Sequence, residues 1–238
     1  MCEICERTAS SRRRFLGLAG AAALAAAGFG PRAAMAAGAV TTLAPDEALT
    51  KLGQGNDRFV ADAQVCSADL SGQRGRVASG QAPWATVLSC ADSRVPPELV
   101  FGGLGLGELF VVRNAGNLID TDVLGTIEYG AEHLGSPLIV VMGHQRCGAV
   151  SAACDVATKH TKFPGSIGPM LAPIVPIAKA AKKQPGDFVT NAVRENARRT
   201  AAAIPHRSPI VAHLAAAGKV KIVSAYYELD SGKVEFLA

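Results

Sequence analysis

The stretch WATVLSC, residues 84–90, is a short run of apolar and β-branched residues that ends in a cysteine. Two similar runs follow it, ELFVVRN at 108–114 and PLIVVMG at 137–143. Runs that are apolar throughout are typical of strands buried on both faces, as the strands of a parallel sheet are. We therefore predict three strands at these positions.

A helical pattern lies between the second and third runs. Residues 120–135 place Val123, Ile127 and Leu134 on one side of a helix. The alternation of strand, helix and strand predicts an α/β fold built on a parallel sheet.

The flanking segments complete this architecture. A helix is predicted over 44–63, and the alanine-rich segment 165–218 is predicted to be mostly helical, with breaks at Pro185 and Pro205. Residues 219–237 indicate a strand, a turn and a second strand. We expect a single α/β domain with a mostly parallel central sheet flanked by helices, an N-terminal helical arm and a C-terminal strand pair.

Residues 1–36 have the three parts of a secretory signal: SRRRFLG at 11–17, an apolar stretch at 18–30, and the small residues AMAAGA at 34–39. The paired arginines resemble a twin-arginine export signal. An ordinary secretory signal and an uncleaved anchor are the alternatives, but the stretch is too rich in alanine and glycine to hold firmly in a bilayer. We expect export to the periplasm, no stable membrane span after signal removal, and one domain over 37–238.

The net charge of +4 excludes one class of partner. Residues 1–36 hold five arginines and two glutamates, a surplus of three, which leaves +1 for the rest of the chain. A nearly neutral body gives no electrostatic reason to bind nucleic acid.

Three motifs are set aside because of their context. Cys2 and Cys5 form a C-x-x-C pair, but they precede the signal. The glycines of GGLGLGEL, 102–109, lead into a strand and not from a strand into a helix, so we predict a turn and no dinucleotide loop. The basic segment RENARR, 194–199, is interpreted as a solvated helix face.

Cysteine and histidine stand at two predicted strand ends, Cys90 after the first strand and His144 with Cys147 after the third. Parallel strands end at one edge of the sheet, where α/β folds bind ligands. Two thiolates and one imidazole suit Zn²⁺ and leave a fourth position for water or substrate, as in catalytic sites. We predict one zinc ion per chain. The alternative is a Cys90–Cys147 disulfide, which an exported protein permits but which would leave Asp92, Arg94 and His144 without a role.

The segments CADSRV (90–95), FVVRNAGN (110–117) and GHQRCGAV (143–150) resemble the β-class carbonic anhydrases. The resemblance extends over most of the chain after the leader. It implies a β-carbonic-anhydrase-like catalytic domain over 37–238 that converts CO₂ and water reversibly to bicarbonate and a proton. The nucleophile would be a metal-bound hydroxide, with zinc on Cys90, His144 and Cys147.

The same resemblance implies that Asp92 and Arg94 are catalytic. Asp92 would accept a hydrogen bond from the hydroxide and so direct its lone pair at the carbon of CO₂. Arg94 is always charged and would keep Asp92 ionised through a bidentate pair. It would also keep the carboxylate from becoming the fourth zinc ligand.

The resemblance further implies substrate-binding roles for Gln81, Phe110, Tyr129 and Gly148. Plain core packing is the alternative for the two aromatic residues. A homodimer or homotetramer is expected, with the 44–63 helix reaching onto a partner and the active site near that interface.

Three other functions remain open at this point. The same site could act on carbonyl sulfide or carbon disulfide, the protein could be a zinc-binding assembly module without catalysis, or it could be a thiol oxidoreductase. Cys66 and Cys154 match nothing catalytic and are interpreted as buried thiols, with a disulfide as the alternative.

Overall fold

The computed structural model describes residues 40–62 and 70–237, with Ser71 placed by its backbone alone. These residues belong to one compact unit, Ala36–Ala238. The predicted signal and Cys2, Cys5 and Cys66 lie outside the described residues.

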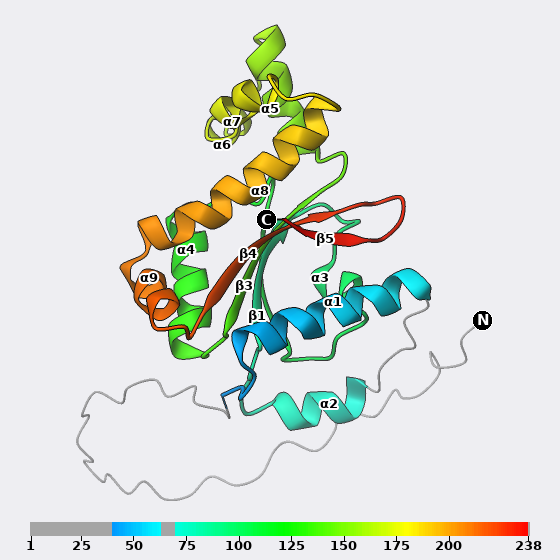
Figure 1. Ribbon diagram of the computed structural model, residues 1–238, viewed down its shortest axis with the longest axis vertical. Helices are drawn as coiled ribbons and strands as arrows, with labels where there is room; N and C mark the ends of the chain where they lie inside the picture. The colour runs from blue at the N-terminus through cyan, green and yellow to red at the C-terminus, as the bar shows by residue number, and fades with distance from the viewer. Residues whose placement is uncertain (1–39, 63–69, 238) are drawn as a thin grey trace, which may run out of the picture. The chain divides into compact units, whose positions relative to one another are not determined.

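A five-stranded sheet forms the centre of the fold (Figure 1). Its strands are β1 (Ala85–Cys90), β2 (Leu109–Asn114), β3 (Leu138–His144), β4 (Lys221–Tyr227) and β5 (Val234–Leu237). The strand order is β2-β1-β3-β4-β5, in which the first four are parallel and β5 pairs antiparallel with β4. The predicted mostly parallel sheet and C-terminal strand pair are confirmed.

The helices connect and cover these strands. They are α1 (Pro45–Ala61), α2 (Leu70–Val77), α3 (Pro97–Val100), α4 (Thr121–Glu128), the π-helical turn η1 (Tyr129–His133), α5 (Gly148–Lys159), α6 (Ile167–Leu171), α7 (Val175–Ala181), α8 (Phe188–Arg207) and α9 (Pro209–Ala216). Over the described part of the chain, none of these helices combines the length and the apolar character that crossing a bilayer requires.

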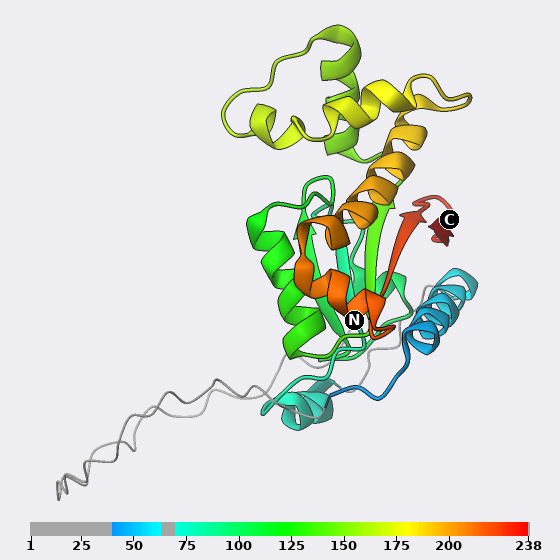
Figure 2. The same ribbon diagram turned by 60° about the vertical axis from the view of Figure 1, so that its left-hand side comes forward.

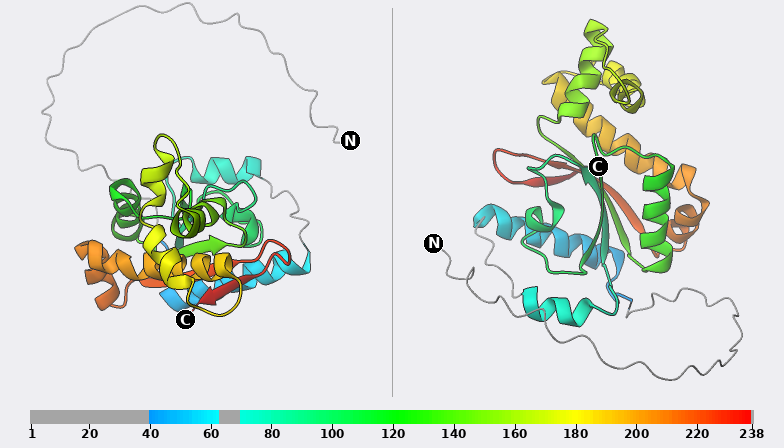
Figure 3. Two further views of the ribbon diagram at one scale, coloured as in Figure 1. Left: turned by 90° about the horizontal axis from the view of Figure 1, so that it is seen from above. Right: turned by 180° about the vertical axis from the view of Figure 1, so that it is seen from behind.

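The sheet separates two apolar cores, because successive strand side chains point to opposite faces. Leu88 belongs to the core under α4, α5, α8 and α9, whereas its neighbour Val87 belongs to the core under α1 and α3. Figure 2 shows α4, α8 and α9 on one side of the strands and α1 on the other, and Figure 3 shows the same arrangement from behind. All six residues of β1 and all seven of β3 are buried, as predicted from their apolar runs.

Helix α1 packs on its own chain through Ala48, Leu52 and Asn56. The Asn56 amide donates to the carbonyls of Val100 (3.0 Å) and Gly232 (2.8 Å), and its oxygen accepts from the N–H of Val234 (2.7 Å). One buried side chain therefore joins α1 to α3 and to the β4–β5 hairpin. Contact of α1 with a partner stays a prediction.

One predicted helix break was wrong. Helix α8 continues through Pro205 and ends at Arg207, since a proline near the end of a helix removes only one backbone hydrogen bond. The chain breaks instead at Ser208, whose hydroxyl accepts from the N–H of Val211 (3.1 Å) and caps α9. The break at Pro185 is confirmed, since Pro185 lies between α7 and α8.

The helix predicted over 120–135 is α-helical only to Glu128 and then widens into η1. Gly130 lies against Thr86 and Phe110, where a Cβ atom would have no room. This close approach to β1 and β2 accompanies the change in helical pitch, and the sequence pattern contains no signal for it.

Candidate metal centre and active site

Three donor side chains converge at the carboxyl edge of the sheet. Cys90 ends β1, His144 ends the neighbouring parallel strand β3, and Cys147 directly precedes α5. Their ligand atoms lie within 4.8 Å of one another, and all three residues are buried. The predicted ligand set is therefore brought together by adjacent strand ends.

The distances between the donors fit a shared metal ion. The two sulfurs are 3.9 Å apart. A tetrahedral zinc ion with Zn–S bonds of about 2.3 Å would separate them by about 3.8 Å, whereas a disulfide bond is about 2.05 Å long. Cys90 and Cys147 are free thiols in the structure, which argues against the disulfide alternative.

The His144 ring is also oriented to bind a metal ion. His144 Nδ1 lies 3.0 Å from the carbonyl oxygen of Gln145, which can only accept, so Nδ1 carries the proton. Nε2 is then left with a lone pair, and it is buried without a hydrogen-bond partner among the described residues. A buried polar atom without a partner is costly, and a metal ion would remove that cost.

A tight turn connects His144 to Cys147. Arg146 adopts a left-handed conformation with φ of 54°, which is unfavourable for a residue with a side chain. Its guanidinium makes a bidentate pair with Asp230 (2.6 and 2.9 Å), and the Gln145 side chain donates to the same carboxylate (3.0 Å). The ligand loop is thus fixed to the turn between β4 and β5.

Asp92 and Arg94 form a bidentate ion pair beside the donors, with nitrogen–oxygen distances of 2.9 and 2.7 Å. The Arg94 hydrogen bonds are the main reason that the pKa of Asp92 lies well below its usual range. Asp92 Oδ2 also lies 3.9 Å from His144 Nε2. The carboxylate is therefore ionised and close to the fourth position that the three protein donors would leave open on a metal ion.

The sulfur of Cys90 is held in a polar environment. It accepts a hydrogen bond from the N–H of Gly116 (3.5 Å), and the Gly116 carbonyl accepts from the Asn196 amide (2.9 Å). A hydrogen bond from the Cys147 thiol is the largest cause that lowers the pKa of Cys90, and the same contact raises the pKa of Cys147. One thiolate is favoured before any metal binds.

Three residues that support the site were not predicted as functional. Arg113 donates to the backbone carbonyls of Cys90 (2.9 Å) and Asp92 (2.6 Å), while Gly116 and Asn196 act as described above. Arg113 and Gly116 belong to the segment FVVRNAGN, whose likeness to the family was the available signal. Asn196 lies within RENARR and is fully buried, as is its neighbour Ala197, so the solvated face predicted there excludes these two positions.

The four predicted substrate-binding residues divide into two groups. Gly148 begins α5 next to Cys147 and is exposed, with no atom close to the position of a Cβ. Phe110 pairs with Thr86 near the start of β1, and the rings of Phe110 and Tyr129 are 6.1 Å apart. Cys90 comes four residues after Thr86 along β1, a distance of about 13 Å.

Gln81 lies further away, before the start of β1 and near Gly107. Within one chain, Gln81, Phe110 and Tyr129 are therefore not brought to the metal donors. Phe110 and Tyr129 instead line an open hollow of about 540 Å³ along α4, and Tyr129 is 41% exposed. Plain core packing does not describe Tyr129.

The predicted buried thiol is confirmed for Cys154, which lies free on the inner face of α5. Burial raises its pKa to about 11. The neutral thiol is a poor nucleophile, which argues against a redox role for Cys154.

Comparison with known proteins identifies the family of this chain. The sequence profile of the family described as carbonic anhydrase matches residues 85–234. The chain is 37% identical over 189 residues to carbonic anhydrase 2 of Mycobacterium tuberculosis, covering 79% of this chain and 91% of that protein. The chain belongs to the carbonic anhydrase family. It is also 37% identical over 191 residues to the carbonic anhydrase of Mycolicibacterium smegmatis, covering 80% and 92% of the two chains.

Solved structures identify this carbonic anhydrase with the β class. It is similar to the β-carbonic anhydrase CafA of Aspergillus fumigatus, with a TM-score of 0.64, 25% identity, and coverage of 81% of this chain and 89% of that one. The Coccomyxa β-carbonic anhydrase gives a TM-score of 0.59 at 28% identity, covering 79% and 86%. A tetrameric β-carbonic anhydrase of Sordaria macrospora shares the fold, with a TM-score of 0.62 at 23% identity, covering 69% and 85%.

Proposed function

We propose that this β-carbonic anhydrase hydrates CO₂ reversibly to bicarbonate and a proton, with one zinc ion held by Cys90, His144 and Cys147. The single observation that carries the proposal is the convergence of these three buried donors, with an unpartnered His144 Nε2, beside an ionised carboxylate. A zinc ion with three protein ligands supplies, when bound, a water whose pKa is lowered from about 15.7 toward 7.

The residues around the donors orient the nucleophile and leave room for a small substrate. Asp92 is ionised and can only accept, so it fixes the proton of a nucleophilic oxygen and turns a lone pair of that oxygen toward substrate. Arg94 holds both carboxylate oxygens, which prevents Asp92 from rotating onto the donor set. The exposed backbone at Gly148 leaves room for a small substrate next to Cys147.

The decisive experiment measures zinc per chain and CO₂ hydration on the same sample, before and after chelation. We expect one zinc per chain, loss of hydration after chelation, and recovery on adding zinc. Activity that survives complete metal removal would refute the proposal. Sensitivity to reductant but not to chelator would indicate a thiol oxidoreductase, and bound zinc without turnover would indicate an assembly module.

The substrate is tested by parallel assays with carbonyl sulfide and carbon disulfide. We expect CO₂ to be the preferred substrate, because the similar proteins are carbonic anhydrases, whereas the orientation of an oxygen nucleophile by Asp92 would serve all three linear molecules. Faster turnover of either sulfur compound would reassign the substrate while keeping the metal site.

We further propose that the enzyme is a homodimer or homotetramer in which Gln81, Phe110 and Tyr129 line the active site of a partner subunit. Two observations support this proposal: these residues lie away from the donors of their own chain, and Tyr129 is exposed on the side of β2, a strand at the edge of the sheet. The protein from Sordaria macrospora, which has the same fold, is described as tetrameric.

Export through the twin-arginine pathway is proposed from residues 1–36 alone. Fusion of this segment to a reporter that acquires its cofactor in the cytoplasm would test it. We expect transport that is lost when Arg12 and Arg13 are both replaced by lysine, and transport that survives this change would indicate another route.

A further inference from the structure

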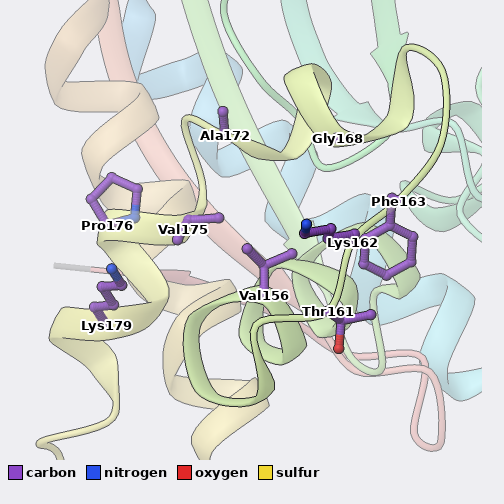
Figure 4. A pocket seen from close by; sticks show the side chains of 9 residues that line it. All are labelled: Val156, Thr161, Lys162, Phe163, Gly168, Ala172, Val175, Pro176 and Lys179. Carbon is purple, nitrogen blue, oxygen red and sulfur yellow. The ribbon is translucent and has the colours of Figure 1, made fainter.

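A second hollow lies away from the metal centre, where α5, α6 and α7 meet. It has a volume of about 520 Å³ and is open to solvent. Figure 4 shows and labels the nine residues that line it. The volume is within the range of about 300–1,000 Å³ that is usual for small-molecule sites.

The walls of this hollow are mostly apolar. Val156 comes from α5, Phe163 from the segment between α5 and α6, and Val175 from the start of α7. Burying the apolar surface of a ligand against them would be favourable at about 25 cal/mol per Å². The walls therefore suit a small hydrocarbon body, either aromatic or branched.

The rim of the hollow is positively charged. Lys162 extends over it beside Val156 and Phe163, and Lys179 stands on the other side next to Val175 (Figure 4). Lys159, by contrast, is paired with Asp155 at 2.9 Å.

Neither rim lysine has a hydrogen bond or ion pair within the described residues, and none of the nine lining residues is acidic. Two uncompensated ammonium groups beside an apolar wall attract an anion that carries an apolar part. The Thr161 hydroxyl offers one further donor at the same rim.

We propose that this hollow binds a small amphiphilic carboxylate, with its apolar body against Val156, Phe163 and Val175 and its carboxylate at the rim that carries Lys162 and Lys179. This site is separate from the metal donors and from their substrate. The inference therefore does not depend on the proposed function, and either can fail without the other.

The test compares two ligands of nearly equal shape, 4-phenylbutyrate and its neutral amide, by calorimetric titration of the zinc-loaded protein. We expect one site per chain for the carboxylate and an affinity about fivefold weaker for the amide, since exposed ion pairs contribute up to about 1 kcal/mol. Equal affinities for the two ligands, or no binding of the carboxylate, would overturn the proposal.

Variants then locate the site. Replacing both Lys162 and Lys179 by alanine is expected to weaken 4-phenylbutyrate about fivefold, and Ala172→Phe is expected to fill the hollow and abolish binding. The matched control replaces Lys182 and Lys183, exposed lysines of the same region that do not line the hollow, and should leave the affinity unchanged. Binding that survives Ala172→Phe, or that the control weakens equally, would place the ligand elsewhere and overturn the proposal.

Discussion

Arg94 shows how one side chain can define the state of another. It holds the carboxylate of Asp92 with two hydrogen bonds and keeps the pKa of Asp92 below its usual range. Because Arg94 is exposed, its ion pair contributes little to the free energy of folding. Its main effect is to fix the position and the charge of the Asp92 carboxylate.

We predict that Arg94→Ala lowers kcat/KM for CO₂ hydration about 100-fold, since loss of orientation by about 1 Å has effects of this size. Removing Arg94 lets the pKa of Asp92 rise only toward its ordinary acidic value, so Asp92 stays ionised and the shape of the pH–rate profile above pH 6 should not change. Stopped-flow assays from pH 6 to 9 test both expectations.

Arg94→Lys keeps the charge but loses the bidentate geometry and should give intermediate activity. Arg199→Ala removes a surface arginine that pairs with Glu195 and should have no effect. Full hydration activity in Arg94→Ala would show that the assigned role is wrong.

Asn196 acts on the metal centre through Gly116. We predict that Asn196→Ala leaves the Gly116 carbonyl without a partner, lowers the free energy of unfolding by about 1–3 kcal/mol, and weakens zinc binding about tenfold or more. Chelator competition measures the zinc affinity. Asn191→Ala, a change on the same helix at a less buried position, should leave zinc affinity unchanged, and equal zinc affinity in both variants would contradict the role.

At the level of elements, α1 is held by unusually close packing. Gly55 faces the backbone of Phe101 and Gly102, where a Cβ atom would not fit, and Gly102 itself has a φ of 91°. Asn56, the next residue, supplies the three hydrogen bonds that connect α1 to α3 and the hairpin.

We predict that Asn56→Ala lowers the free energy of unfolding by about 2–4 kcal/mol, because three backbone groups, of which those of Val100 and Val234 are buried, lose their partner. Denaturant unfolding measures the change. Gln54→Ala, an exposed position of the same helix, should change stability by less than about 0.5 kcal/mol. Similar stability of the two variants would mean that α1 contributes little to the fold.

The elements divide into those that the sequence predicts and those that it does not. The apolar runs ending at Cys90 and His144 identify β1 and β3, because a strand that is buried on both faces carries apolar residues at successive positions. The widening at Tyr129 accompanies the close approach of Gly130 to β1 and β2, which no local pattern reports. The position of the break after Pro205 is local, since Ser208 caps α9 and Pro209 occupies its first turn.

The whole molecule explains why some predicted site residues lie apart. Cys90, His144 and Cys147 meet because neighbouring parallel strands share an edge, which topology alone dictates. Gln81, Phe110 and Tyr129 were predicted from resemblance, and in the oligomer proposed above their assembly with a metal centre would require a second chain, which the sequence of one chain does not describe.

We predict that Tyr129→Ala and Cys90→Ser variants, each impaired alone, restore activity when they are co-assembled. If Tyr129 serves the partner's centre, a mixed dimer has one intact site of two, so the purified mixed dimer should recover about half of the wild-type activity per chain. Assays on the co-expressed, doubly tagged oligomer measure the recovery. No recovery, with an oligomer confirmed by light scattering, would place Tyr129 outside the active site.

The 3.9 Å gap between the sulfurs of Cys90 and Cys147 has a consequence for the lifetime of the enzyme. A shift of about 2 Å would bring them to bonding distance, so the coordinated cation also works as a protecting group against oxidative crosslinking. When demetallated protein is treated with oxidised glutathione, peptide mapping should detect a Cys90–Cys147 disulfide. The oxidised protein should not bind zinc until dithiothreitol is added. The zinc-loaded enzyme should resist the same treatment. A shortage of zinc would therefore inactivate this protein in two ways, by leaving the site without its metal and by exposing the two cysteines to oxidation.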